Sequence, residues 1–295
     1  MAATRILVTG ASGFVGQHCL RPLAAAFGEV IALSRQARQS ESGILWKQFD
    51  LLGENPAEII DDVRPTHLLH LAWEATPGSY LDSPLNAAWL RSSKELLRAF
   101  AEAGGQRAVV AGSCAEYDWS GGTCREGLTP LASESPYAEA KNELFAWINS
   151  EVNTSFAWAR LFFVFGPGEP AGRLIPYIWR TLIADGQATL SAGEQRRDYV
   201  YVKDVANALT DLAISGLEGA INIGSGEAQQ IRAIVKAVQH AANRGSVSFG
   251  TTPDRYPLVV ADVDRLVVEL GYAHQFTFDQ ALSETLMSIG LDQRA

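Results

Sequence analysis

The chain has 295 residues, 47% of them hydrophobic, and carries a net charge of −9 at pH 7. This length is enough to bury a full α/β core together with a small second lobe. The acidic balance argues against a nucleic-acid partner, and no apolar run reaches the ~18 residues that a membrane span needs.

The three cysteines, Cys19, Cys114 and Cys124, are widely spaced, which supports neither a disulfide framework nor a zinc site. The five histidines show no metal-ligand spacing either, so we expect no metal. The first predicted strand begins almost at once, which leaves no room for a signal peptide. We therefore expect a cytoplasmic protein with no membrane partner.

Short apolar runs alternate with helical patterns along the first 165 residues. Alternation of this kind, with nearly continuous apolar strands, is typical of a doubly wound parallel α/β sheet of the Rossmann type. Strands are predicted over 5–9, 29–34, 44–49, 66–72, 107–113 and 155–165, and helices over 14–26, 56–63, 85–103 and 135–150.

After residue 168 the pattern loosens, and short strands and loops rich in glycine and proline separate the predicted helices. We interpret residues 1–167 as the sheet domain, with later segments near 196–224 that return to it. Most of 168–295 is predicted to form a small C-terminal α/β lobe that binds the substrate. The helices predicted in this second part lie near 172–185, 203–215, 229–243 and 279–289.

A glycine-rich turn follows the first predicted strand, with the spacing G-x-x-G-x-x-G. The order of strand, glycine turn and helix is the context in which a dinucleotide fingerprint is found, although the standard spacing is G-x-G-x-x-G. Glycines let the backbone turn tightly and approach a pyrophosphate, which binds at the positive N-terminus of the helix. We therefore expect a dinucleotide cofactor to contact Gly10, Ser12, Gly13, Phe14, Val15 and Gly16.

Tyr137 and Lys141 lie four residues apart in the helix predicted over 135–150, on one face of that helix. An ammonium beside a phenol favours the phenolate, so a tyrosine that ionises near pH ~10 can act as an acid or base near neutrality. Ser113 ends the strand predicted over 107–113, at the carboxyl edge of the sheet where ligands bind in such folds. A serine there can hydrogen-bond a substrate oxygen and orient the tyrosine.

Two further motifs follow predicted strands. Asp50-Leu51 comes after the third strand, where an aspartate can contact an adenine, and His70-Leu71-Ala72 ends the fourth strand. Together with the glycine turn, Ser113 and the Tyr137/Lys141 pair, and in this order, they resemble the extended short-chain dehydrogenase/reductase family. Within that family the chain is most similar to the nucleotide-sugar epimerase/dehydratase group. The resemblance covers nearly the whole chain and includes 160–168, 197–205 and 222–226.

The resemblance implies that Ser113, Tyr137 and Lys141 form a catalytic triad. Tyr137 would pass a proton to or from the sugar oxygen while hydride moves at the nicotinamide. Lys141 would hold the cofactor ribose and lower the pKa of Tyr137, and Ser113 would hydrogen-bond the reacting oxygen. The cofactor carries the redox chemistry, and the protein supplies placement and proton handling.

The resemblance also implies contacts at the two ends of the cofactor. It places Asp50 and Leu51 at the adenine, and Leu71 and Ala72 beside the nicotinamide. Relatives commonly pair helices of the cofactor domain across a two-fold interface, so we expect a homodimer.

The residues at the end of the second strand indicate which cofactor is used. NAD-specific relatives usually carry an acidic residue there that grips the adenosine ribose, whereas this chain has Ser34 and Arg35. No carboxylate repels a 2′-phosphate at this point, and a guanidinium can stack on adenine and pair with that phosphate. We therefore expect NADP(H) to be favoured over NAD(H). The alternative is that Arg35 is a surface residue and cofactor binding is permissive.

Three arginines are candidates for binding the diphosphate of a nucleoside-diphosphate sugar. Arg197 matches a family position that grips the diphosphate, Arg255 lies where a second such arginine is often found, and Arg173 is a further candidate. Single arginines are more often solvated than functional, so each can also be a plain surface residue. Trp73 and Tyr80 follow the fourth strand and are candidates for lining the sugar pocket.

Departures from the family pattern indicate the reaction. In 4,6-dehydratase relatives an Asp-Glu pair follows the catalytic Ser or Thr, but Cys114 and Ala115 stand here, which argues against dehydration. Many 4-epimerases place a substrate-binding Asn where this chain has Phe163. Because cells keep NADPH reduced, an enzyme that uses it more often makes a net reduction. The chain is thus similar to reductases of 4-keto-6-deoxy nucleotide sugars, of the abequose or paratose synthase type.

Three alternatives stay open at this point. A 4-epimerase of nucleotide sugars would retain its cofactor through purification and consume no NADPH. A reductase of a non-nucleotide carbonyl compound would bind NADPH and ignore nucleoside diphosphates. A sensor or scaffold that binds NADP without turnover would have no use for an intact set of Ser113, Tyr137 and Lys141.

Overall fold

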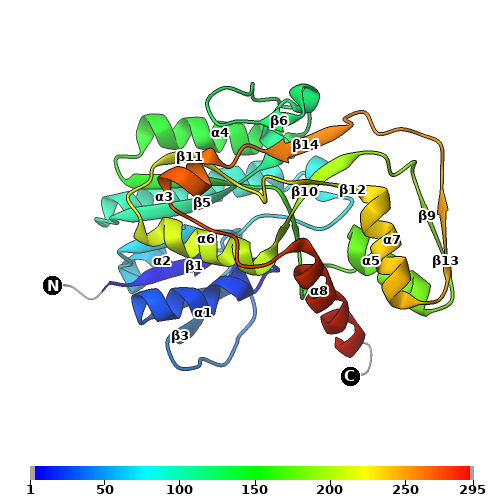
Figure 1. Cartoon of the computed structure of the whole chain (residues 1–295). Coiled ribbons are helices and arrows are strands. Elements are labelled where there is room, and N and C mark those ends of the chain that lie inside the picture. Colours follow the sequence, from blue (N-terminus) through cyan, green and yellow to red (C-terminus); the bar gives the residue numbers. More distant parts are fainter. Residues whose placement is uncertain (1–3, 293–295) are drawn as a thin grey trace.

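Seven parallel strands form the main sheet of the computed structural model, which describes residues 4–292 (Figure 1). The sheet confirms the predicted doubly wound α/β fold of the Rossmann type. The strands lie in the order β11-β7-β5-β4-β1-β2-β3. They are β1 (Ile6–Thr9), β2 (Val30–Ser34), β3 (Ile44–Gln48), β4 (His67–His70), β5 (Arg107–Ser113), β7 (Ser155–Leu161) and β11 (Gly219–Ile223).

The strand order turns at β1, because β2 and β3 lie on one side of it and β4, β5 and β7 on the other. The connections that leave β1 and β4 therefore diverge, and a crevice opens at the carboxyl ends of these two strands. Ligands of open α/β sheets bind in this crevice. The glycine turn after β1 and the loop after β4 both line it.

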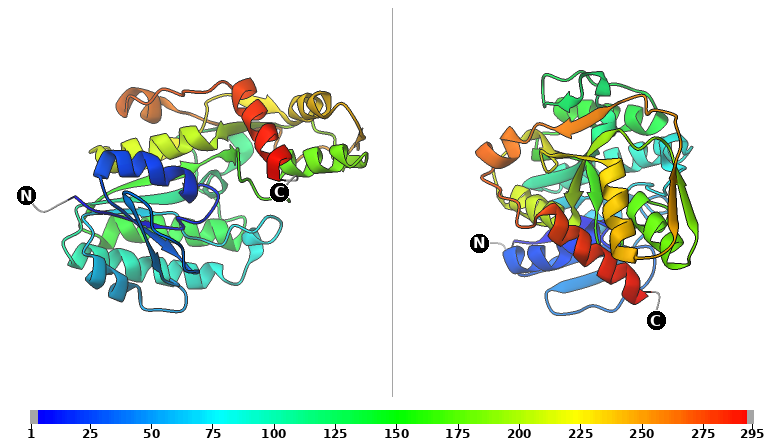
Figure 2. Two further views of the ribbon diagram at one scale, coloured as in Figure 1. Left: turned by 90° about the horizontal axis from the view of Figure 1, so that it is seen from below. Right: turned by 45° about the vertical axis from the view of Figure 1, so that its right-hand side comes forward.

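Helices cover both faces of the main sheet (Figure 2). Side chains of a strand alternate between the faces, so Ile6 and Val8 of β1 join one core and Leu7 joins the other. Because both faces are buried at the centre of the sheet, β1 and β2 are almost entirely apolar, which makes them easy to predict. One face carries α1 (Gly16–Phe27) and α6 (Val202–Ile214), and the other carries α2 (Pro56–Val63), α3 (Asn86–Glu102) and α4 (Pro136–Glu151).

A second, smaller sheet lies beside the carboxyl edge of the main sheet (Figure 1). Beyond it, β9 (Gln187–Leu190) and β13 (Ser246–Phe249) form a separate parallel pair. Helix α5 (Leu174–Ile183) packs against α7 (Ile231–Ala242) and α8 (Phe278–Asp292). The smaller sheet contains β6 (Thr123–Cys124), β8 (Phe163–Phe165), β10 (Arg196–Tyr201), β12 (Ala228–Gln230) and β14 (Leu258–Ala261).

The single strand predicted over 155–165 is wrong, because the chain changes sheets within it. β7 ends at Leu161 in the main sheet, and β8 begins at Phe163 in the smaller one. The Phe162 N–H still donates to the Ile223 carbonyl at 3.0 Å, so the chain leaves the main sheet just after this bond. Later, α6 and β11 return to the main sheet. The division into two lobes at residue 167 stays a prediction.

Short helical turns complete the structure. Three 3₁₀ turns lie in the loops, η1 (Tyr80–Asp82), η2 (Cys114–Glu116) and η3 (Trp119–Gly121), and a π-helical turn covers Arg265–Glu269. Within residues 4–292, no helix combines the length and the apolar character that crossing a membrane requires.

A buried ion pair joins the end of β5 to β7. Arg160 Nε donates to Glu116 Oε2 at 2.6 Å, and the two side chains are 2% and 0% exposed. Trp158 Nε1 donates to the same oxygen at 2.9 Å, and the Ser113 N–H donates to Oε1 at 2.7 Å. Arg160 also donates to the Tyr117 hydroxyl at 2.9 Å. These bonds satisfy the remaining polar atoms, which a buried ion pair needs in order to offset its desolvation.

Arg160→Met is expected to lower the free energy of unfolding by about 3–5 kcal/mol, because it leaves the buried Glu116 carboxylate without its partner. Urea unfolding followed by circular dichroism measures this change. Lys47→Met is the control, since Lys47 pairs with Asp62 at the surface and exposed pairs contribute about 0–1 kcal/mol. Equal losses for the two variants would contradict the role of the buried pair.

Candidate active site

A cavity of about 280 Å³ lies at the carboxyl edge of the main sheet. It brings together the glycine turn after β1, the loop after β4, the end of β5, the first turns of α4, and β8. Predicted site residues make up much of its lining: Gly10, Gly13, Phe14, Val15, Gly16, Leu71, Ala72, Trp73, Ser113, Tyr137, Lys141, Phe163 and Arg173.

The glycine turn fits the diphosphate of a dinucleotide. Gly10 has a φ of 67°, and a Cβ atom there would lie 2.7 Å from the Ala72 nitrogen, so only glycine lets the turn pack on the end of β4. A Cβ at Gly16 would lie 2.2 Å from the Gly10 oxygen. Among residues 4–292, no side chain caps the start of α1 at Val15, and its first turn holds no acidic residue. The positive end of α1 thus suits an anionic group, although the Gln17 and His18 N–H groups already donate to the Gly13 and Val15 carbonyls at 3.1 Å.

The chain brings Ser113, Tyr137 and Lys141 together from β5 and α4. Helix α4 begins here because the Ser135 hydroxyl accepts the Ala138 N–H at 3.2 Å and a proline occupies the first helical position. This start places Tyr137 in the first turn, where it lines the cavity together with Ser113. Lys141, one turn later, is buried and points back to β5.

Burial decides the charges of the two α4 side chains. It raises the pKa of Tyr137 above its ordinary value, with Tyr80 adding to the rise and the hydrogen bond with Ser113 opposing it. Burial also lowers the pKa of Lys141 to about 7, against the attraction of Glu116. The expectation that Lys141 lowers the pKa of Tyr137 is therefore wrong for this structure. Desolvation is the largest influence on this pKa, and at neutral pH Tyr137 is a phenol.

Aromatic rings form much of the remaining cavity wall. Trp73 and Tyr80 both lie edge-on to the Tyr137 ring, with centroids 6.2 Å and 5.0 Å away. Trp119 and Phe163 face each other at 6.1 Å. The wall therefore offers apolar surface close to the hydroxyl of the catalytic candidate Tyr137.

Cys114 lies beside Ser113 in the cavity lining. Burial raises the pKa of its thiol well above the ordinary value, so the thiol stays protonated. Its carbonyl accepts the Trp119 indole N–H at 2.7 Å, which fixes that ring in the wall. Cys114 and Ala115 thus place no group that ionises near neutral pH at the positions where dehydratase relatives carry an acidic pair.

The residues predicted at the end of β2 lie outside the cavity lining. Ser34 is buried, and its hydroxyl accepts the Gln36 N–H at 3.2 Å. Arg35 is exposed, and its charge helps to lower the pKa of Glu74 after the hydrogen bonds from Thr76. Glu74 lines the cavity, whereas Arg35 is not part of the lining.

The other residues predicted for the cofactor are not part of the cavity lining. Asp50 accepts the Leu52 N–H at 3.1 Å, which shapes the turn after β3. Leu51 is buried in the core, and its carbonyl accepts the Ser92 hydroxyl at 2.6 Å. Ser12 is an exposed residue of the glycine turn.

The three candidate arginines lie in different surroundings. Arg173 lines the cavity and donates to the Val164 carbonyl at 3.1 Å. Arg197 is buried outside the lining, pairs with Asp254 at 2.8 Å, and lies 5.8 Å from the Phe163 ring. Arg255 is exposed and pairs with Glu134 at 3.2 Å.

Glu116 is the site residue that sequence reasoning missed. It accepts the Ser113 N–H, and the Ser113 hydroxyl in turn accepts the Ala115 N–H at 3.2 Å. These reciprocal bonds form a capping box around η2. The signal in the sequence is the S-x-x-E spacing after a strand, which predicts such a box.

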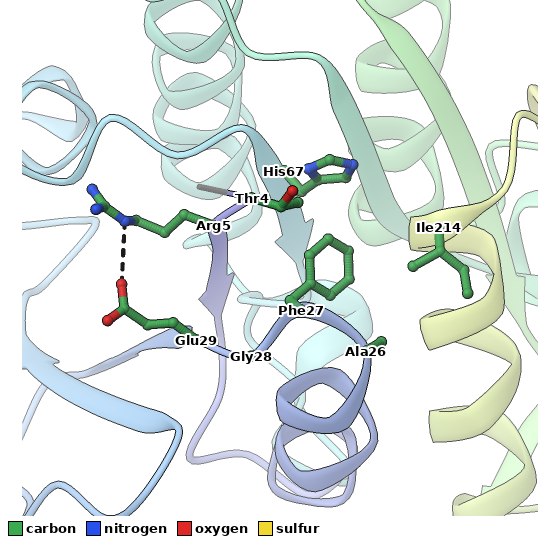
Figure 3. Close-up of a pocket in the computed structure, with 8 residues that line it drawn as sticks. All are labelled: Thr4, Arg5, Ala26, Phe27, Gly28, Glu29, His67 and Ile214. Carbon is green, nitrogen blue, oxygen red and sulfur yellow. Dashed lines mark ion pairs between the residues drawn. The ribbon is translucent and has the colours of Figure 1, made fainter. Parts of the chain in front are cut away.

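A second hollow lies at the opposite edge of the main sheet, where β1 begins (Figure 3). Arg5 and Glu29 form an ion pair of 3.2 Å there, and burial lowers the pKa of His67. Ligands of open α/β sheets bind at the carboxyl ends of the strands, and this hollow lies at the amino ends. Its lining contains Thr4, Arg5, Ala26, Phe27, Gly28, Glu29, His67 and Ile214, which are not among the predicted site residues.

The sequence matches the model of the NAD dependent epimerase/dehydratase family over residues 6–224. The dTDP-6-deoxy-L-talose 4-dehydrogenase (NAD(+)) of Aggregatibacter actinomycetemcomitans is 27% identical over 78% of this chain and 88% of that protein. The CDP-abequose synthase of Salmonella typhimurium is 24% identical over 95% of this chain and 97% of that protein.

The solved structure of MoeE5 in complex with UDP-glucuronic acid and NAD has a TM-score of 0.84 and 25% identity, and covers 98% of this chain and 99% of its own. The resemblance to the extended short-chain dehydrogenase/reductase family is confirmed. The chain is an enzyme that belongs to the NAD dependent epimerase/dehydratase family.

Proposed function

We propose that the enzyme reduces the keto group of a 4-keto-6-deoxy nucleotide sugar with NADPH. The observation that carries the proposal is the Tyr137 phenol, which burial keeps protonated beside Ser113 in the cavity at the glycine turn. Reduction of a carbonyl needs a proton donor at its oxygen, and a phenol in its acid form meets this need. A phenolate would suit the reverse oxidation better.

Each residue of the cavity has a separate role in the proposed reduction. When bound at the glycine turn, the dinucleotide supplies a hydride for the carbonyl carbon. Tyr137 gives its proton to the carbonyl oxygen, so that the product is an alcohol. Ser113 donates a hydrogen bond to the same oxygen and fixes its position. The Lys141 ammonium, one helical turn away, stabilises the phenolate that forms when Tyr137 has given up its proton.

The proposal of NADPH depends on this chain's own residues. The ribose-binding carboxylate that NAD-specific relatives place after β2 is replaced by Ser34 and Arg35, and Arg35 is exposed. Of the similar proteins, the talose dehydrogenase carries NAD(+) in its name and MoeE5 was solved with NAD. A preference for NADP would therefore distinguish this enzyme from them.

The proposal of a nucleotide sugar draws on the relatives and on the cavity. The abequose synthase and the talose dehydrogenase are named for CDP- and dTDP-linked deoxy sugars. The aromatic rings near Tyr137 offer apolar surface that suits a deoxygenated sugar carbon. Arg173 in the lining, with Arg197 and Arg255 nearby, supplies candidates for the diphosphate. A homodimer in the cytoplasm stays a prediction.

Tyr137→Phe is expected to lower kcat by about 100-fold or more, because it removes the proton donor. The consumption of NADPH is measured with CDP- and dTDP-linked 4-keto-6-deoxyglucose as substrates. NADPH binding should stay at the wild-type level, which separates lost chemistry from lost folding. Tyr177→Phe is the control, since Tyr177 is an exposed tyrosine of α5. Similar turnover by Tyr137→Phe and the wild type would overturn the proposed role.

A calorimetric screen of NADP, NAD, UDP, GDP, CDP and dTDP against the wild type tests both halves of the proposal. We expect NADP to bind more tightly than NAD by about tenfold, because a guanidinium–phosphate hydrogen bond contributes about 1.5–3 kcal/mol. At least one nucleoside diphosphate should bind without competing with NADP. Tighter binding of NAD than of NADP would contradict the proposed cofactor. If no nucleoside diphosphate binds, the proposal of a nucleotide-sugar substrate is wrong.

Two variants assign these affinities to residues. Arg35→Ala should lower the affinity for NADP by about tenfold and leave the affinity for NAD unchanged. Arg91→Ala is the control, because Arg91 is an exposed arginine of α3 away from the cavity lining. Equal affinities of the wild type and Arg35→Ala for NADP would assign the preference to another group.

A further inference from the structure

The ammonium of Lys141 lies in an aromatic enclosure. Its Nζ is 3.8 Å from the centre of the Trp73 ring, and 5.8 Å and 5.9 Å from the ring centres of Tyr137 and Trp158. It donates one hydrogen bond, to the Ala111 carbonyl at 2.8 Å. Lys141 is only 3% exposed. This carbonyl and the Trp73 face therefore supply most of the favourable interactions that water would otherwise make with the ammonium.

Trp73 is itself fixed from two sides. Its indole N–H donates to Asn86 Oδ1 at 2.8 Å, and its ring stacks on Trp89 at 6.3 Å with an interplanar angle of 26°. Asn86 is buried at the start of α3 and also donates to the Tyr80 carbonyl at 2.9 Å. α3 and η1 therefore set the orientation of the ring that Lys141 touches.

We infer that Trp73 is a positioning residue for Lys141, holding the ammonium between its indole face and the Ala111 carbonyl. A lysine side chain has four rotatable bonds, and its ammonium is a point charge without preferred planar geometry. A single hydrogen bond leaves such a group free to turn. A cation on an indole face adds a second attachment, and the attraction grows when water is excluded.

The titratable groups around Lys141 leave its charge dependent on pH. Glu116 of η2 favours the ammonium, and Tyr137 of α4 is a neutral phenol. His70 of β4 is held by Thr9 and Ser93, and burial lowers its pKa to about 3, so it is neutral. The pKa of Lys141 itself is lowered to about 7. The cation on Trp73 is thus present below pH 7 and lost above it.

The fluorescence of Trp73 provides a test that needs no substrate. Titration of the wild type should show a step in tryptophan emission centred near pH 7, because the charge on the indole face disappears there. The step should be absent from both Trp73→Phe and Lys141→Met. It should persist in Trp147→Phe, a matched control whose ring carries the surface cations Lys94 and Arg98. A step of unchanged size in Trp73→Phe or in Lys141→Met would overturn the inference.

Two substitutions of Trp73 separate a positioning role from a packing role. This second experiment rests on the proposed reduction, because it measures turnover. Trp73→Phe keeps an aromatic face, so we expect turnover near the wild-type level. Trp73→Leu should lower kcat by about tenfold, because it removes the attraction of the face for the ammonium. The midpoint of its pH profile should rise, since burial is the larger influence and water would now reach Lys141.

The outcomes distinguish the inference from the proposed function. Equal kcat and equal pH midpoints for Trp73→Leu and Trp73→Phe would refute the positioning role while leaving the reduction in place. Failure of all variants and the wild type to reduce any substrate would refute the proposed function, and the fluorescence step would still decide the role of Trp73. Thermal unfolding of each variant excludes loss of the fold as the cause.

Discussion

The buried carboxylate of Glu116 is the constraint on which the geometry of the cavity depends. It has no access to water, and its two oxygens accept hydrogen bonds from Ser113, Trp158 and Arg160. An ionised group in such a place is tolerated only when its partners are held in good geometry. The need to satisfy this charge therefore fixes the end of β5 against β7, and with it the backbone that presents Ser113 to the cavity.

Desolvation then determines the charges of the side chains beside this fixed edge of the sheet. Helix α4 is started by its Ser135 cap, so that Tyr137 and Lys141 face the same buried space. In this space burial acts oppositely on the two groups, keeping the phenol protonated and bringing the ammonium close to neutrality. Near neutral pH the site therefore holds a protonated phenol beside a partly ionised lysine, an arrangement that suits proton donation during reduction.

Much of the fold could be predicted because local chemistry determines it. The strands around β1 are apolar on both faces, and the glycine turn and the Ser135-Pro136 start of α4 are local signals. The break after Leu161 could not be predicted, because β7 and β8 form one apolar run and only pairing with different sheets divides it. The partners of Arg197 and Lys141 come from segments that are distant in the sequence, so no local spacing predicts these contacts. Burial of Tyr137 likewise reversed the expected direction of its pKa.

In the proposed reaction a buried phenol protonates a sugar carbonyl during net reduction by NADPH. The most direct measurement uses NADPH deuterated at the transferring position, with a 4-keto-6-deoxy nucleotide sugar, and locates the label in the product by mass spectrometry and NMR. For a net reduction we expect a single deuterium at C4 and release of one NADP⁺ for each sugar reduced. A C4 epimer formed without label, with the cofactor retained by the protein and no NADPH consumed, would contradict it.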